Sequence, residues 1–183
     1  MDTIHINPYF FEPFAFYIFP RAGQASAWVQ AMEMYDGYFK RAFHARLLAL
    51  LNKPGELLVD TQRDVLKVVV IDPHHRTRNR GIGCVRGFGL KRGAIGCTTN
   101  CENQKLVVVG TSDAEIANTV KAISVLGGSF VAVCAGELLG AVKLNVAGCM
   151  SSALWETVHD SSLALDENVK RVSDAQFVSL ISL

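Results

Sequence analysis

Hydrophobic residues along this chain fall into short β-branched runs and longer stretches with helical spacing, separated by polar or glycine-rich segments. The clearest run, LKVVVI at residues 66–71, is almost continuously apolar, as in strands that are buried on both faces. It predicts a central strand. Similar runs predict further strands at residues 82–85, 90–97, 106–109, 130–133 and 138–146.

A hairpin is predicted upstream of this central strand. Residues 27–34, AWVQAMEM, favour a strand, Asp36 and Gly37 form a strong turn signal, and residues 39–47 alternate as a return strand. The run at residues 47–51 fits the beginning of a short helix equally well, so both alternatives stay open.

Two helices are predicted downstream. Ser112 and Glu115 form a capping box at the start of the first helix, and Gly127 with Gly128 ends it. Ser151 or Ser152 can cap the second helix. The apolar faces contain Ile116, Val120, Ile123 and Leu126 in the first helix, and Leu154, Val158, Leu165, Val169 and Val172 in the second. The predicted fold class is therefore α+β, with a mixed, mostly antiparallel sheet packed with two main helices.

The N-terminal stretch at residues 9–19, YFFEPFAFYIF, is rich in aromatic residues. Glu12 and Pro13 interrupt it, and it is too short to span a bilayer. It lacks the basic start and the small-residue cleavage site of a signal peptide. We expect residues 1–26 to form an aromatic arm on a domain at residues 27–183, with its rings packed on that domain or on a partner.

Composition limits the possible partners. The 183 residues are half hydrophobic and 19% charged with a net charge of +1, so neither nucleic acid nor a membrane is expected as a partner. The five cysteines are odd in number and lack CxxC spacing, which favours reduced thiols in the cytoplasm.

Three kinds of chemistry can be considered for the side chains of this sequence. His74, His75, Cys97 and Cys101 are the only clustered soft ligands and lack zinc-site spacing, so we expect no metal bound by this chain alone. Cys101 as a nucleophile would have Glu102 beside it, which disfavours a thiolate.

The third kind is anion binding. The stretch GFGLKRG at residues 87–93 is glycine-rich and basic, and it predicts either an anion cradle or a solvated hairpin edge. The neighbouring basic residues are Arg76, Arg78, Arg80, Arg86, Lys91 and Arg92. RNA binding would require interleaved exposed aromatic residues, and only Phe88 is a candidate.

The order of several motifs resembles one family. VRGFGLKRGAIG at residues 85–96 is followed by a polar loop and by LVVVGTSDAEIA at residues 106–117, and this order resembles the C-terminal domain of bacterial adenine deaminases. DVLKVVVIDPHH at residues 64–75 and LGGSFVAV at residues 126–133 also match. LNVAGCMS at residues 144–151 is similar to the family's Pro-x-Ala-Gly-Leu-Met-Ser ending.

The resemblance implies a deamination reaction and a metal-binding barrel domain that these residues do not include. Such enzymes resemble the amidohydrolase superfamily, in which a barrel domain holds manganese or iron and activates the water that converts adenine to hypoxanthine and ammonia. These 183 residues are too few to include that barrel. The resemblance therefore implies a barrel-bearing deaminase chain or a homo-oligomer as partner, and a small-molecule purine as ligand.

One loop departs from the family pattern. Relatives typically carry a His-Asp-Ser-His run, where this chain has Cys101, Glu102, Asn103 and Gln104. Both imidazoles are replaced, and only Glu102 keeps a carboxylate that could act in catalysis. Cys101, Asn103, Gln104, Arg86, Lys91 and Arg92 are the candidates for contacting substrate. We expect either a C-terminal domain inactive alone, or a non-catalytic relative that binds purine or serves assembly.

Overall fold

A computed structural model describes residues 4–12, 26–33, 43–51, 56–99 and 104–171. The strands are β1 (Ser26–Glu33), β2 (Phe43–Leu50), β3 (Leu66–Ile71), β4 (Arg80–Arg86), β5 (Ala94–Cys97), β6 (Leu106–Gly110), β7 (Ser129–Cys134) and β8 (Glu137–Lys143). The helices are the 3₁₀ turn η1 (Pro8–Phe11), α1 (Asp113–Leu126) and α2 (Trp155–Lys170).

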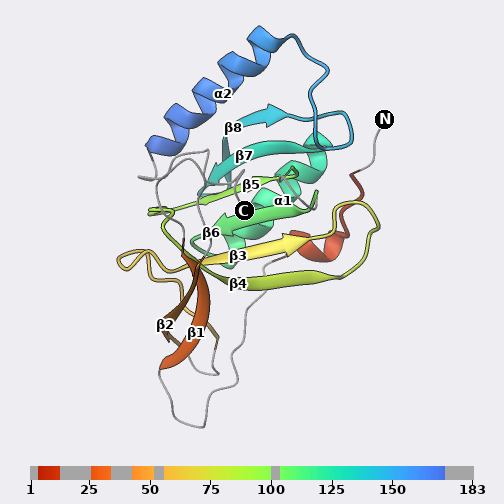
Figure 1. The fold of residues 1–183 in the computed structure, drawn as a ribbon. Helices are drawn as coiled ribbons and strands as arrows, with labels where there is room; N and C mark the ends of the chain where they lie inside the picture. The colour runs from red at the N-terminus through yellow and green to blue at the C-terminus, as the bar shows by residue number, and fades with distance from the viewer. Residues whose placement is uncertain (1–3, 13–25, 34–42, 52–55, 100–103, 172–183) are drawn as a thin grey trace.

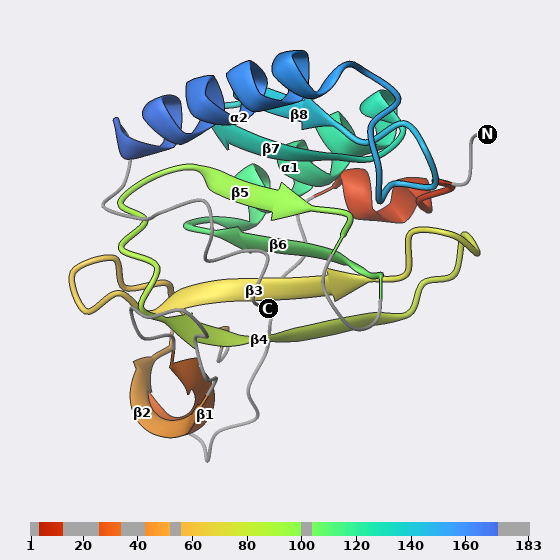
Figure 2. The same ribbon diagram turned by 45° about the horizontal axis from the view of Figure 1, so that its top comes forward.

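The strands form one sheet in the order β2-β1-β4-β3-β6-β5-β7-β8 (Figure 1). β1 and β4 pair in parallel, and the other neighbouring strands pair antiparallel. The predicted α+β class is confirmed. Figure 2 shows the β1–β2 hairpin curling away from the rest of the sheet.

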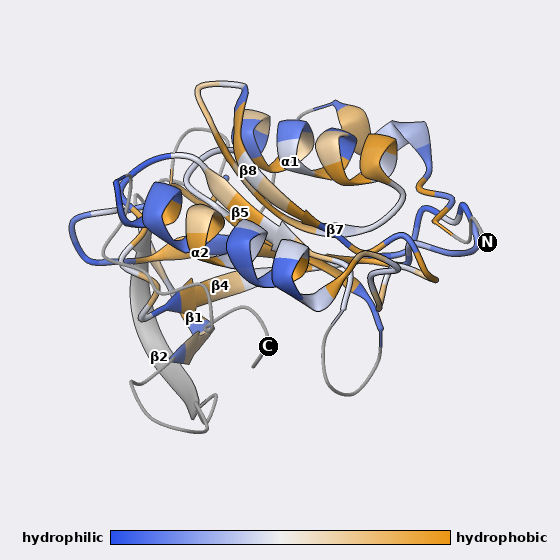
Figure 3. Cartoon of the chain, turned by 90° about the horizontal axis from the view of Figure 1, so that it is seen from above, coloured by the Kyte–Doolittle hydropathy of each residue, from blue (hydrophilic) through white to orange (hydrophobic). Residues whose placement is uncertain are grey.

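The sheet lies between α1 and α2, which cover opposite faces (Figure 3). Successive side chains of a strand point to opposite faces, so β3 supplies Leu66 and Val68 to the α2 side and Val69 and Ile71 to the α1 side. This double burial confirms the prediction from the LKVVVI run.

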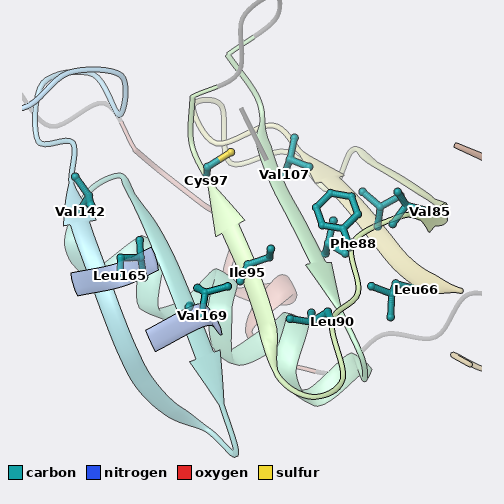
Figure 4. Packing of buried hydrophobic residues seen from close by; sticks show 13 residues of the cluster. Leu66, Val85, Phe88, Leu90, Ile95, Cys97, Val107, Val142, Leu165 and Val169 are labelled. Carbon is teal, nitrogen blue, oxygen red and sulfur yellow. The ribbon is translucent and has the colours of Figure 1, made fainter. Parts of the chain in front are cut away.

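The cluster on the α2 side is shown in Figure 4. Leu165 and Val169 come from α2, while Phe88 and Leu90 come from the connection between β4 and β5. Phe88 is 1% exposed, so its ring belongs to the core. The one aromatic candidate for stacking on RNA bases is therefore not accessible.

The helix α1 has the predicted caps. Ser112 accepts a hydrogen bond from the N–H of Glu115, and Gly127 closes the helix in the left-handed conformation at φ 72°. Ile116, Val120 and Ile123 are fully buried, as their helical spacing predicts.

The described part of the predicted N-terminal arm packs on the α1 side of the sheet. Ile4, Ile6 and Phe10 are buried in the cluster that contains Val120 of α1. The backbone N–H of His5 also donates to the carbonyl of Pro73 at 2.7 Å. Within residues 4–12, the aromatic arm therefore contacts its own domain, while the rest of the arm lies outside the described residues.

Two local predictions are corrected. The helix alternative at residues 47–51 is wrong, because β2 continues to Leu50 and pairs with β1 along its whole length. Neither Ser151 nor Ser152 caps α2, whose N-cap is Leu154 without a side-chain hydrogen bond. Ser152 instead exchanges two hydrogen bonds with Asn145, which close the preceding turn. Val172 lies outside the described residues.

Gly110 provides a test of the close packing between α1 and β6. A Cβ atom there would lie 2.6 Å from Cγ1 of Ile116 and 2.9 Å from Cβ of Ala94. We expect Gly110→Ala to lower the free energy of unfolding by about 1–3 kcal/mol, because the helix would have to move away. Urea denaturation of the wild type and the variant measures this difference.

Gly81→Ala is the matched control. Its added Cβ would meet only Cβ of Val70, at 3.8 Å. We expect a change within about 0.5 kcal/mol. Equal destabilisation by the two variants would contradict the steric explanation for Gly110.

Candidate functional site

The loops that resemble the deaminase family gather at one edge of the sheet. β3 and β5 end there while β4, β6 and β7 begin there, because Ile71 pairs with Arg80 and Leu106, and Cys97 pairs with Val107 and Phe130. We call this the loop edge. It carries residues 72–79, 98–99, 104–105 and 144–154, and lies at the right of Figure 1.

The structure separates the predicted substrate-contacting residues into two groups. Gln104 lies at the loop edge, whereas Arg86 ends β4 at the opposite edge and Lys91 and Arg92 follow it in the connection to β5. The four residues of β5 separate the two edges by about 10 Å. Arg86 pairs with Glu33, with 3.6 Å between Nη1 and Oε1. Cys101, Glu102 and Asn103 lie outside the described residues.

The residues on either side of the segment 100–103, Thr98 and Gln104, form hydrogen bonds with the turn of the LNVAGCMS motif. The hydroxyl of Thr98 donates to the carbonyl of Gly148 at 2.6 Å and accepts from the N–H of Ser129 at 3.0 Å. The thiol of Cys149 donates to Oε1 of Gln104 at 2.7 Å. Thr98 and Gln104 therefore both contact the LNVAGCMS motif.

Asp72 connects two loops of the same edge. Its carboxylate accepts a 3.1 Å hydrogen bond from the N–H of His74, contacts Nδ1 of His75 at 2.8 Å, and lies 3.5 Å from Nζ of Lys105. Burial alone would raise the pKa of Asp72, but these hydrogen bonds and positive charges outweigh it and lower the pKa.

Further basic residues of the loop edge surround one aromatic ring. The guanidinium carbons of Arg78 and Arg80 lie 5.1 Å and 5.3 Å from the ring centroid of Tyr9. These are cation–π distances. The basic residues that are neighbours in the sequence therefore form two separate groups. Arg78 and Arg80 lie at the loop edge, and Arg86 lies at the opposite edge of the sheet.

The glycine-rich stretch binds a carboxylate of its own chain. Asp64 accepts hydrogen bonds from the N–H groups of Gly87 at 2.6 Å and Gly89 at 2.8 Å. Asp64 itself has a φ of 55°, a conformation that aspartate tolerates better than most residues. The amides that an external anion would need are therefore occupied. Sequence reasoning missed Asp64, because it precedes the glycines by more than 20 positions.

A buried ion pair lies at the opposite edge. Lys67 is 2% exposed and its Nζ donates to the carboxylate of Asp113 in the first turn of α1. Burial, together with the neighbouring carboxyl of Glu56, raises the pKa of Asp113 although Lys67 lowers it. The pair anchors the start of α1 to β3, which is a structural role.

The buried cysteines do not offer a nucleophile. Burial raises the pKa of the Cys84 thiol to about 11 and that of the Cys97 thiol to about 12. Both groups therefore stay protonated near neutral pH.

The described residues also lack a metal-ligand group. They contain no cluster of three or more His, Cys, Asp or Glu side chains that could hold an ion. His74 and His75 have ring centroids 6.3 Å apart and nearly perpendicular planes, and His75 is engaged by Asp72. The manganese or iron that the resemblance implies does not fit this set of side chains.

Comparison with known proteins decides the family. A family model described as the adenine deaminase C-terminal domain matches residues 44–183. The chain belongs to this family. The adenine deaminase of Gluconobacter oxydans is 43% identical over 116 residues, which are 63% of this chain and 20% of that protein. An adenine deaminase of Clostridium botulinum is 37% identical over 129 residues, 70% of this chain and 22% of that protein.

The family membership confirms the resemblance seen in the motifs. The chain spans about a fifth of the length of the relatives that it matches. Among the described residues of this C-terminal-type domain, no helix is long and apolar enough to cross a membrane.

Substitution of Asp64 tests the contribution of its hydrogen bonds from Gly87 and Gly89, which we call the Asp64 clamp. We expect Asp64→Ala to lower the free energy of unfolding by about 1–3 kcal/mol, because two N–H groups lose their acceptor. Asp64→Asn keeps one acceptor oxygen and should fall between the wild type and the alanine variant. Urea denaturation measures all three, and equal stabilities would contradict the clamp.

Asp72 predicts a dependence on pH. Its pKa in the folded state lies below the usual 3.8, so its stabilising contribution is present above about pH 4 and is lost as the pH falls through the folded value. Because the group is close to solvent, we expect Asp72→Asn to lower the free energy of unfolding at pH 7 by only about 1 kcal/mol.

Denaturation at pH 7 and at pH 2.5 tests this expectation, and the difference in stability between wild type and variant should be smaller at the lower pH. A difference of the same size at both pH values would mean that the Asp72 charge is not its source.

Proposed function

We propose that this chain is the C-terminal domain of an adenine deaminase, and that it turns its loop edge toward a metal-bearing part supplied outside these 183 residues. The match to the C-terminal domain family carries the proposal. The coverage of about a fifth of each relative supports it, as does the lack of a metal-ligand group among the described residues.

The assembled enzyme would hydrolyse adenine. Water adds to the ring carbon that bears the amino group, and ammonia leaves to give hypoxanthine. Manganese or iron in the other part would supply an activated water near neutral pH. In this chain we assign proton transfer to Glu102, and contact with the purine to Cys101 and Asn103.

Gln104 and the basic candidates take different places in this proposal. Gln104 lies at the foot of the loop, where Cys149 and Thr99 donate to its side-chain oxygen. Arg86, Lys91 and Arg92 lie at the opposite edge of the sheet, which favours a role away from the purine. We place the protein in the cytoplasm because its described cysteines are free thiols.

A second candidate function follows from the hydrogen bonds that Gln104 accepts. The family typically has an imidazole there, whereas this amide accepts hydrogen bonds from its own domain and cannot exchange protons near neutral pH. This observation favours a non-catalytic relative that binds purine or serves as an assembly module.

An absorbance assay for conversion of adenine to hypoxanthine tests the proposed function. We expect the isolated chain with manganese or iron to be indistinguishable from a metal-only control, because no described group can hold the metal. Adding a purified barrel-bearing deaminase segment from the Gluconobacter oxydans relative should raise the rate. Robust turnover by the isolated chain would contradict the proposal.

Calorimetric titration with adenine separates the two candidates if the partner restores no activity. Binding of adenine without turnover would favour the purine-binding relative. No heat of binding would favour the assembly module.

A further inference from the structure

Three large hydrophobic side chains are exposed within six residues at the loop edge. Met150, Leu154 and Trp155 are 60%, 74% and 73% exposed, and they follow directly on the turn that holds Gln104. We call these three side chains the apolar patch. Single exposed hydrophobic residues are ordinary, whereas large apolar side chains that are exposed together are typical of interaction sites.

The backbone beneath the patch is fixed. Asn145 and Ser152 exchange hydrogen bonds of 2.7 Å and 3.0 Å, and Val146 and Met150 form an antiparallel bridge. Leu154 accepts the first bond of α2 from the N–H of Val158 at 3.2 Å. A partner would therefore meet a preorganised surface and would have little backbone to order.

The patch continues the surface of the candidate site. Cys149 contacts Gln104 and is followed directly by Met150, so the turn that contacts Gln104 also begins the patch. A partner protein that covers Trp155 would also lie close to the loop edge. Glu156 in the first turn of α2 and Asp160 in the next turn are exposed and supply a charged rim.

The lengths of the relatives indicate which partner this is. In them, a region like this chain accounts for about a fifth of the protein, and the matching family is a C-terminal domain. We propose that the apolar patch is the docking surface for the preceding, metal-bearing part of an adenine deaminase, with Trp155 as its central anchor. This inference rests on the proposed function and specifies the surface of contact.

The test measures binding of the full 183-residue chain to the part of the Gluconobacter oxydans deaminase that precedes its matched region. We expect the wild-type chain to bind, and we expect Trp155→Ala to raise the dissociation constant roughly 30-fold or more, as for central aromatic anchors. Leu154→Ala should raise the dissociation constant by a smaller factor.

Val125→Ala is the matched control. Val125 is 81% exposed on α1, which covers the other face of the sheet. We expect binding within about twofold of the wild type. Thermal melting followed by circular dichroism should be unchanged in all variants, since each side chain is exposed.

Two results would overturn the docking surface alone: wild-type affinity of Trp155→Ala for this partner, or loss of a wild-type homodimer in that variant during sedimentation. The second result would assign the patch to another copy of the chain. Failure of the wild-type chain to bind the partner would instead remove the proposed function, and this inference with it.

Discussion

The burial of β3 on both faces is the constraint on which the rest of this structure depends. Val68 packs toward α2 and Val69 toward α1, so a register slip of one residue would exchange the two sets of side chains. The register is therefore fixed by packing as well as by the hydrogen bonds to β4 and β6. Glycine at position 110 lets α1 lie against the sheet, and the ion pair of Lys67 with Asp113 fixes the beginning of that helix.

A fixed register determines which loops meet. Because β3 and β5 end where β4, β6 and β7 begin, the segments around Asp72, Thr98 and Gly148 come together at the loop edge. The hydrogen bonds of Thr98 then join two motifs that are 50 residues apart in the chain. The same topology places Arg86 at the other edge, so basic residues that are neighbours in sequence serve different surfaces.

Family membership accounts for the scaffold more directly than for the chemistry, because a fold can keep its packing while its site changes. The buried positions on both faces of the sheet, the N-cap Ser112 of α1 and the hydrogen bonds of Asp64 to the glycine-rich connection all maintain the scaffold. At the loop edge, the thiol of Cys149 contacts the side-chain oxygen of Gln104 and thereby joins the turn at residues 146–150 to the segment that leads into β6.

The sequence by itself determined most of the strands and the first helix, because periodicity, caps and turn residues are local signals. The order of its motifs indicated the family. Tertiary structure decided what no local signal contains: that Phe88 enters the core, that Asp64 holds Gly87 and Gly89, and that Ser152 closes a turn instead of capping α2. A hydrophobic pattern shows that a residue will face something apolar, but it does not identify the partner. The contact of Gln104 with Cys149 spans 45 positions, and only the assembled sheet brings these two residues together.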